Sequence, residues 1–286
     1  GSLNVTGHAN LTADSILLGD AAGDSVQFGS LEFHSTGDVG ISETGDLSLS
    51  GDSSGNNVEL VSAGSLGISA TLSAAGFVDL DAVDTVSLTG AIEADGLVAI
   101  DAGNQVDLDG DISGSVAAAA DSVTVGGTTA PNLVTIDGGI LANSGIAISG
   151  AGNIILGATA LLNSDANSDL TGNVAVTVAG AFTQTAGSDI TGTGGLTKAG
   201  SGSLVLSQAN TYTGGTTVNA GTLQVSTGGS VASSFVLAGG TLDVDGQITG
   251  NVTLNAGTMT GVGTVTGNVV NNATIAPGNS PGVLTI

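Results

Sequence analysis

Residues 78–108 read VDLDAVDTVSLTGAIEADGLVAIDAGNQVDL, and this stretch decides the fold. Four triplets of the form apolar-x-apolar stand in it: VDL from Val78, VSL from Val86, VAI from Val98 and VDL from Val106. Their first residues lie 8, 12 and 8 positions apart, so two triplets and two turns form a unit of 20 residues. A repeat of this length is typical of proteins built from stacked supersecondary units.

The same spacing continues along the chain in both directions. Upstream triplets begin at Val39, Leu47, Val58 and Leu66; downstream, Ile154 and Val174 lie 20 residues apart, and Leu204, Leu223 and Leu242 follow at steps of 19. Alternation with period two predicts strands in which the outer residues of each triplet face a core. One unit cannot bury its apolar side alone, so we expect a β-solenoid with units stacked about 4.8 Å apart.

The composition supports a core of small aliphatic residues and excludes several functions. Hydrophobic residues make up 41% of the chain and aromatic residues only 2%, which argues against a disordered linker and for a core of Val, Leu, Ile and Ala. The net charge of −24 would repel nucleic acid and anionic membranes. We find no apolar run of about 18 residues that would predict a membrane-spanning helix. Without cysteine, disulfide and thiolate chemistry are excluded.

Short polar segments separate the triplets. Gly followed by Asn or Asp precedes many of them, as at 37–39, 152–154 and 172–174. Gly and Asn tolerate left-handed backbone angles at little cost, so these segments are read as turns. Asn side chains at equivalent corners could also form hydrogen-bonded ladders along the stack. Both interpretations of the corners stay open at this point.

One segment carries a family resemblance. Residues 194–225, GGLTKAGSGSLVLSQANTYTGGTTVNAGTLQV, resemble the passenger-associated transport repeat of bacterial autotransporters, and residues 273–286, ATIAPGNSPGVLTI, resemble a segment found near the end of such passengers. The resemblance implies a right-handed parallel β-helix that is exported through an outer-membrane pore. Residues 3–190 resemble, more loosely, the repeats of filamentous-haemagglutinin-like exoproteins. The motif positions are Lys198, Gly200, Gly202, Asn210, Tyr212, Gly214, Gly215 and Gly221.

We therefore expect two regions of one β-helix. Residues 1–193 would be coils like those of filamentous haemagglutinin, and residues 194–286 would continue the helix with the transport repeat. Lys198 is the only basic residue in the chain and falls on the family's usual lysine. It can also be read as a solvated surface lysine that pairs with a carboxylate, and the two interpretations are compatible.

Catalytic motifs are weak in this sequence. GDSSG at 51–55 places Ser53 as a would-be nucleophile, and GNSPG at 278–282 fits the same pattern. The nucleophile elbow needs a following helix and a base. No helix is predicted here, and the candidate bases are limited to His8 and His34. With 49 glycines in the chain, chance matches are expected.

The carboxylates allow two further readings. DLDAVD at 79–84 could supply the carboxylate pair of an inverting glycosidase, although an aromatic sugar platform is missing. The 20-residue period also places Glu59 above Asp79, and Asp81 above Asp101, on the outer surface. Stacked like charges repel, and Ca²⁺ could relieve this repulsion. The alternative is a simply solvated acidic face, and a melting midpoint unchanged by EDTA and by excess Ca²⁺ would exclude the calcium hypothesis in its favour.

These observations favour a non-enzymatic passenger piece of a large secreted protein on a bacterial cell surface, associated with the outer membrane. Its expected role is a rigid stalk or adhesin shaft whose repeat assists export and folding. The expected partners are an outer-membrane translocation barrel and glycans or proteins on host or neighbouring cells, without nucleic acid. No cofactor is expected apart from Ca²⁺. The alternatives are a polysaccharide-active β-helix enzyme and a glycan- or receptor-binding module.

Overall fold

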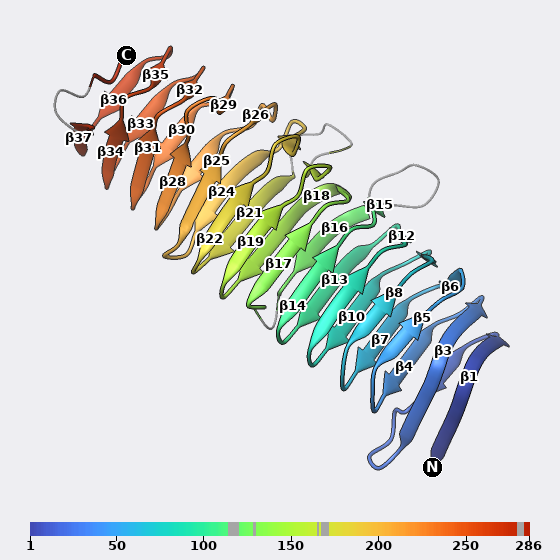
Figure 1. Cartoon of the computed structure of the whole chain (residues 1–286). Helices are drawn as coiled ribbons and strands as arrows, with labels where there is room; N and C mark the ends of the chain where they lie inside the picture. The colour runs from blue at the N-terminus through green and yellow to red at the C-terminus, as the bar shows by residue number, and fades with distance from the viewer. Residues whose placement is uncertain (114–119, 128–129, 165, 167–171, 279–282) are drawn as a thin grey trace. The chain divides into compact units, whose positions relative to one another are not determined.

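A computed structural model describes residues 1–113, 120–127, 130–164, 166, 172–278 and 283–286. The chain forms two compact units, residues 1–142 and 143–286. In each unit short strands pair in parallel with the strands one turn away, as Figure 1 shows. The predicted parallel β-solenoid with about 20 residues per turn is confirmed. The described residues form no helix of the length and apolarity needed to cross a membrane.

The strands of unit 1 are short apart from the first and third. They are β1 (Ser2–Ala13), β2 (Ile16–Leu18), β3 (Ser25–Ser35), β4 (Val39–Glu43), β5 (Leu47–Leu49), β6 (Ser53–Gly55), β7 (Val58–Ser62), β8 (Leu66–Ile68), β9 (Thr71–Ala74), β10 (Val78–Ala82), β11 (Thr85–Leu88), β12 (Ala91–Ala94), β13 (Leu97–Ala102), β14 (Gln105–Leu108), β15 (Ile112–Ser113), β16 (Ala120–Val125) and β17 (Leu133–Ile136). The following strand, β18 (Gly139–Gly150), crosses the division between the units.

Each regular turn of unit 1 contains three strands, one more than the triplets predicted. The first two stacks are β4–β7–β10–β13 and β5–β8–β11–β14, and they hold the predicted triplets. The third stack, β6–β9–β12–β15, was missed. Its inward positions combine one large residue with alanine, as in Leu72 and Ala74 or Ile92 and Ala94. Such a strand lacks the apolar-x-apolar pair of large residues that marked the other two.

The 20-residue register holds where the sequence is most regular. Val78 pairs with Val58 on one side and with Val98 on the other, and all three are fully buried. At one corner between strands the turns approach so closely that only glycine fits. A Cβ at Gly110 would lie 1.6 Å from the carbonyl oxygen of Gly90. Both the aliphatic core and the narrow corners therefore repeat with the same period.

The strands of unit 2 follow the same parallel scheme. They are β19 (Asn153–Leu156), β20 (Leu161–Asn163), β21 (Asn173–Val178), β22 (Ala181–Gln184), β23 (Asp189–Thr191), β24 (Gly195–Ala199), β25 (Ser203–Leu206), β26 (Ala209–Asn210), β27 (Thr216–Val218), β28 (Thr222–Val225), β29 (Ser230–Val231), β30 (Phe235–Leu237), β31 (Thr241–Val244), β32 (Gln247–Ile248), β33 (Val252–Leu254), β34 (Thr258–Gly261), β35 (Thr264–Val265), β36 (Val269–Asn271) and β37 (Thr274–Pro277). Strands β26, β29, β32 and β35 form a separate four-stranded sheet.

The constant period predicted for the second half is wrong at one place and confirmed at another. Ile154 does not stack on Val174; it pairs with Phe182, 28 residues on, while Val174 pairs with Leu196. Extra residues between strands lengthen a turn without disturbing the ladder, so sequence distance alone misassigns the partner. The steps of 19 from Leu204 to Leu223 and to Leu242 are confirmed.

The proposed corner ladder exists in a short form. The amide Nδ2 of Asn104 donates to Asp84 Oδ1 at 3.1 Å, and Asn132 Nδ2 donates to Asn104 Oδ1 at 3.4 Å. The boundary predicted at 193/194 rests on repeat type and not on packing, and it stays a prediction.

Candidate functional site

The segment that resembles the transport repeat runs from β24 to β28 and buries polar side chains inside unit 2. Lys198, Asn210 and Tyr212 are exposed by only 0%, 3% and 1% of their surface. Lys198 and Asn210 occupy inward positions that aliphatic residues fill in adjacent turns. A buried polar group costs free energy unless it is hydrogen-bonded, so the partners of these three residues define what the segment does.

Lys198 lies in the core, where the surface interpretation is wrong. It stands in β24 between Val176 of the preceding turn and Val218 of the following turn. Its Nζ donates to three main-chain carbonyls: Ala199, Gly200 at 2.9 Å and Ala220 at 3.3 Å. Burial lowers the pKa of Lys198 because it penalises the charged form. The ammonium group thus joins the turn that follows β24 to the turn that follows β27.

Gly221 lies beside this lysine, and both its own backbone conformation and the neighbouring atoms require a glycine there. Gly221 has φ +68°, and a Cβ there would lie 2.9 Å from Lys198 Nζ and 2.2 Å from the carbonyl oxygen of Gly202. A side chain would therefore strain the backbone and press on the lysine. The sequence TKAG followed by NAG places one lysine and one tight corner on adjacent turns.

Asn210 forms a buried amide pair with Gln184. Gln184 Nε2 donates to Asn210 Oδ1 at 2.7 Å, and Asn210 Nδ2 donates to Gln184 Oε1 at 3.1 Å. Asn210 also accepts from the Ile190 amide at 3.2 Å and donates to the Gln208 carbonyl at 3.1 Å. The amide of Ser207 donates to Gln184 Oε1 at 3.1 Å. This network connects β26 to the preceding turn of the solenoid.

Tyr212 belongs to a second network, which extends toward the following turn. Its hydroxyl lies 2.6 Å from Thr216 Oγ1, which lies 2.8 Å from Ser233 Oγ, and all three side chains are buried. Burial is the main cause that raises the pKa of Tyr212 to about 12. The phenol therefore stays protonated at neutral pH and can act as a hydrogen-bond donor.

The other motif glycines differ in how strictly the fold needs them. A Cβ at Gly202 would lie 1.9 Å from the Gly180 carbonyl oxygen, and one at Gly214 would lie 2.4 Å from the Gly194 carbonyl carbon. Gly200 has φ +74°, and its Cβ would lie 2.5 Å from the Val178 carbonyl oxygen. At Gly215 the nearest atom would be 3.8 Å away, so sterics do not demand glycine there.

One comparison with known proteins finds this segment. Residues 196–225 match the family model described as passenger-associated-transport-repeat. The chain carries a passenger-associated transport repeat. Together, the transport repeat and the β-solenoid fit an autotransporter passenger. Searches of the curated proteins and of the solved structures found no significant match.

The transport repeat thus joins three successive turns of unit 2 through its interior. Asn210 bonds Gln184 of the preceding turn, and Lys198 bonds Ala220 of the following turn. Tyr212 is linked to Ser233 of the following turn through Thr216. Sequence reasoning identified the motif positions but missed Gln184, Thr216 and Ser233. The signal that could have found them was polar residues in phase with inward aliphatic positions.

The candidate serine site has no catalytic arrangement at Ser53. Its side chain is buried; Oγ donates to the Gly51 carbonyl at 3.1 Å and accepts from the Phe33 amide at 3.2 Å. The histidine next to this segment contacts the neighbouring residue, with His34 Nδ1 3.3 Å from Ser54 Oγ. Residues 51–55 lie in and next to the short strand β6, not on a strand-to-helix elbow. Most of GNSPG, residues 279–282, lies outside the described residues.

The predicted register of carboxylates in unit 1 is present. Glu59 pairs with Asp79, and Asp81 pairs with Asp101. Burial raises the pKa of Asp79 and of Asp81, and the neighbouring carboxylates raise both further. Among the residues that the structure describes, no group of three or more His, Cys, Asp or Glu side chains is arranged to hold a metal ion. Calcium binding at this face stays a prediction.

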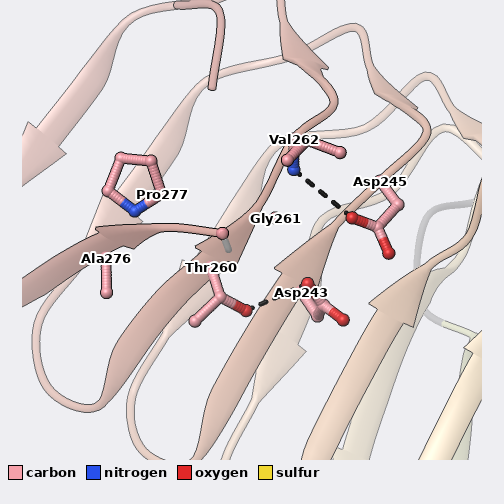
Figure 2. Close-up of a pocket in the computed structure, with 8 residues that line it drawn as sticks. Asp243, Asp245, Thr260, Gly261, Val262, Ala276 and Pro277 are labelled. Carbon is pink, nitrogen blue, oxygen red and sulfur yellow. Dashed lines mark hydrogen bonds between the residues drawn. The ribbon is translucent and has the colours of Figure 1, made fainter. Parts of the chain in front are cut away.

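A depression on unit 2 gathers two carboxylates near β31, β34 and β37 (Figure 2). Asp243 accepts from Thr260 Oγ1 at 3.0 Å, and Asp245 accepts from the Val262 amide at 3.3 Å. Gln224 Nε2 donates to both carboxylates, at 3.1 and 3.0 Å. Each carboxylate oxygen therefore already accepts a hydrogen bond, and these contacts join β28 to β31 and β34.

Proposed function

We propose that this chain is a structural stalk segment of a secreted, surface-exposed bacterial protein, and that its transport repeat is a locally stable block that assists export. The stalk role is supported by parallel ladders and a continuous row of buried aliphatic residues within each unit. In such repeat architectures each turn contacts only its neighbours, so stability is set locally and folding can propagate from turn to turn.

The observation that carries the proposal is the set of buried hydrogen bonds inside the repeat. Aliphatic turns are held by non-directional burial, whereas this block adds directed bonds to adjacent turns. Lys198 and Asn210 make such bonds directly, and Tyr212 is linked to Ser233 through Thr216. A segment of this kind would fold early on the outer side of a membrane pore. Once folded it could not slip back, so the remaining turns would add onto it.

An export assay tests this proposal. The chain is placed between a secretion signal and an outer-membrane translocation barrel, and its amount on the cell surface is measured with an antibody. Asn210→Ala leaves Gln184 and the Ile190 amide without their buried partner, so we expect less passenger at the surface. Thr217→Ala changes an outward residue of the same repeat and should export like the wild type.

Trypsin supplies the matching folding readout. Lys198 is the only tryptic site of the chain and is fully buried, so the folded repeat should resist cleavage and the unfolded repeat should be cut once. Export equal to wild type by an Asn210→Ala variant whose Lys198 has become cleavable would refute the proposed role of the repeat in export.

The adhesive role remains a separate expectation. A screen against glycans and receptor-bearing cells tests it. A reducing-sugar assay on acidic and neutral polysaccharides tests the enzyme alternative.

A further inference from the structure

Glu43 is an acidic side chain at an inward position of unit 1. It ends β4, and the residues stacked on it along the register are Ser62, then Ala82 and Ala102. Only 3% of its surface is exposed. Aliphatic or small residues fill the neighbouring inward positions, so a carboxylate here needs its own explanation.

One oxygen of Glu43 has a clear role and the other has none. Oε1 accepts from the Phe28 amide at 2.9 Å. Oε2 is fully buried and has no hydrogen-bond partner; Ser164 Oγ is the one other side-chain atom of this kind among the described residues. Burial is the main cause that raises the pKa of Glu43, and the nearby Asp46 raises it further. An unpaired buried carboxylate oxygen is costly at neutral pH, so something other than a protein donor should satisfy it.

The surroundings of Glu43 are rich in oxygen. It lines a pocket between the first two turns whose other lining residues are Asn4, Val5, Thr6, Gln27, Phe28, Gly29, Gly45 and Asp46. The β1–β3 ladder shifts register between Val5 and His8, next to this pocket. Main-chain carbonyls gather at this bulge, since a Cβ at Gly29 would lie 2.5 Å from the Thr6 oxygen and 2.9 Å from the Gly7 oxygen.

We propose that this pocket binds a divalent, oxygen-seeking cation such as Ca²⁺, with Glu43 and Asp46 as its carboxylate ligands. Asn4 and Gln27 offer carboxamide oxygens, and the bulge at Thr6 offers a main-chain carbonyl. Two carboxylates completed by neutral oxygens suit Ca²⁺, which accepts six to eight oxygen ligands in flexible geometry. Nitrogen- and sulfur-seeking metals find neither His nor Cys among the residues that line this pocket.

Binding here would fasten the first turn to the second. The ligands come from β1, from β3, and from the end of β4 with the turn that follows it, so one cation would hold three segments together. The unpaired Oε2 would become a ligand oxygen. The alternative is that Glu43 is protonated. A neutral carboxyl group at this position would bind no metal.

Calcium titration of the whole chain by calorimetry and native mass spectrometry separates the two occupants. At neutral pH and constant ionic strength, we expect Glu43→Gln to bind one Ca²⁺ fewer per chain than the wild type and to lose the matching rise in melting temperature. Asp46→Asn should weaken this one ion at least tenfold while keeping the fold, because Asn can still accept from the Ser65 amide.

Asp14→Asn is the matched control. Asp14 is an exposed acidic residue of unit 1 outside the pocket. Its variant removes one negative charge, as the other two variants do, and should keep the full count of bound Ca²⁺. Equal calcium counts and equal melting shifts for the wild type, Glu43→Gln and Asp46→Asn would overturn the proposal and assign Glu43 a proton.

Discussion

Alkaline titration of the transport repeat gives the sharpest test of its buried network. The chain has one tyrosine, one lysine, no arginine and no cysteine, and both titratable side chains are buried in the repeat. The pKa of Tyr212 is raised to about 12 from the ordinary value of 10.0. The two-unit difference corresponds to about 3 kcal/mol between the protonated and ionised forms.

The sign of the effect follows from proton linkage. The folded chain holds the phenol proton to higher pH than the unfolded chain does. The stability that Tyr212 contributes is therefore fully present below about pH 10 and is lost as the pH rises through about 12. Lys198 acts in the opposite direction. Its pKa is lowered on folding, so its contribution is smallest at neutral pH and grows toward the ordinary value of 10.5.

Denaturant unfolding of the wild type and Tyr212→Phe measures this difference. At about pH 8 the variant should be less stable by about 1 kcal/mol, because Thr216 loses its bond to the hydroxyl. Near pH 12 the order should reverse, since phenylalanine has no proton to lose. Because Tyr212 is the only tyrosine and the chain has no tryptophan, the phenolate absorbance reports its pKa directly.

One result would refute this reasoning. A phenolate midpoint near pH 10 in protein whose circular dichroism is still native would show that Tyr212 meets water. The chain from Tyr212 through Thr216 to Ser233 would then not exist as a buried network.

Three further predictions concern facing, corners and the buried ammonium. Val98→Asp should destabilise by about 4 kcal/mol or more because it buries a carboxylate, whereas Ala99→Asp, on the outer face of the same strand, should be mild; similar melting of the two would contradict the facing. Gly202→Ala should lower the free energy of unfolding by about 1–3 kcal/mol, because its Cβ would lie 1.9 Å from a carbonyl oxygen. Gly215→Ala should lower it by less than about 0.5 kcal/mol, because the nearest atom would be 3.8 Å away. Chemical denaturation measures both, and the reverse order would contradict the corner geometry. Lys198→Met should lower the free energy of unfolding by about 2–3 kcal/mol, since three carbonyls lose their donor; unchanged stability would mean that water replaces the ammonium.

The fold was largely predictable because the core repeats. The triplets at Val58, Val78 and Val98 stand in the predicted register. Period-two alternation determines which residues of each strand face the core. The third strand of each turn was not predicted, because Ala74 and Ala94 give little hydrophobic contrast. The stacking of Ile154 was also missed, because turn length is invisible to a search at constant spacing.

The candidate site was predicted as a set of positions, but its chemistry was not. The sequence predicts Lys198 as a motif position and as a surface charge, yet it points inward, in phase with Val176 and Val218. The alternation in LTKA does place the lysine on the same side as Leu196, but a charged residue is normally assigned to solvent.

By itself, the sequence of this protein determined the strand class, the parallel stacking and the turn length, because each follows from local periodicity and from small aliphatic residues that one unit cannot bury. The tertiary structure alone decided where polar groups find partners. The Ala220 carbonyl that Lys198 bonds and the Gln184 amide that Asn210 bonds come from neighbouring turns, and no local pattern records which groups stacking brings within hydrogen-bond distance.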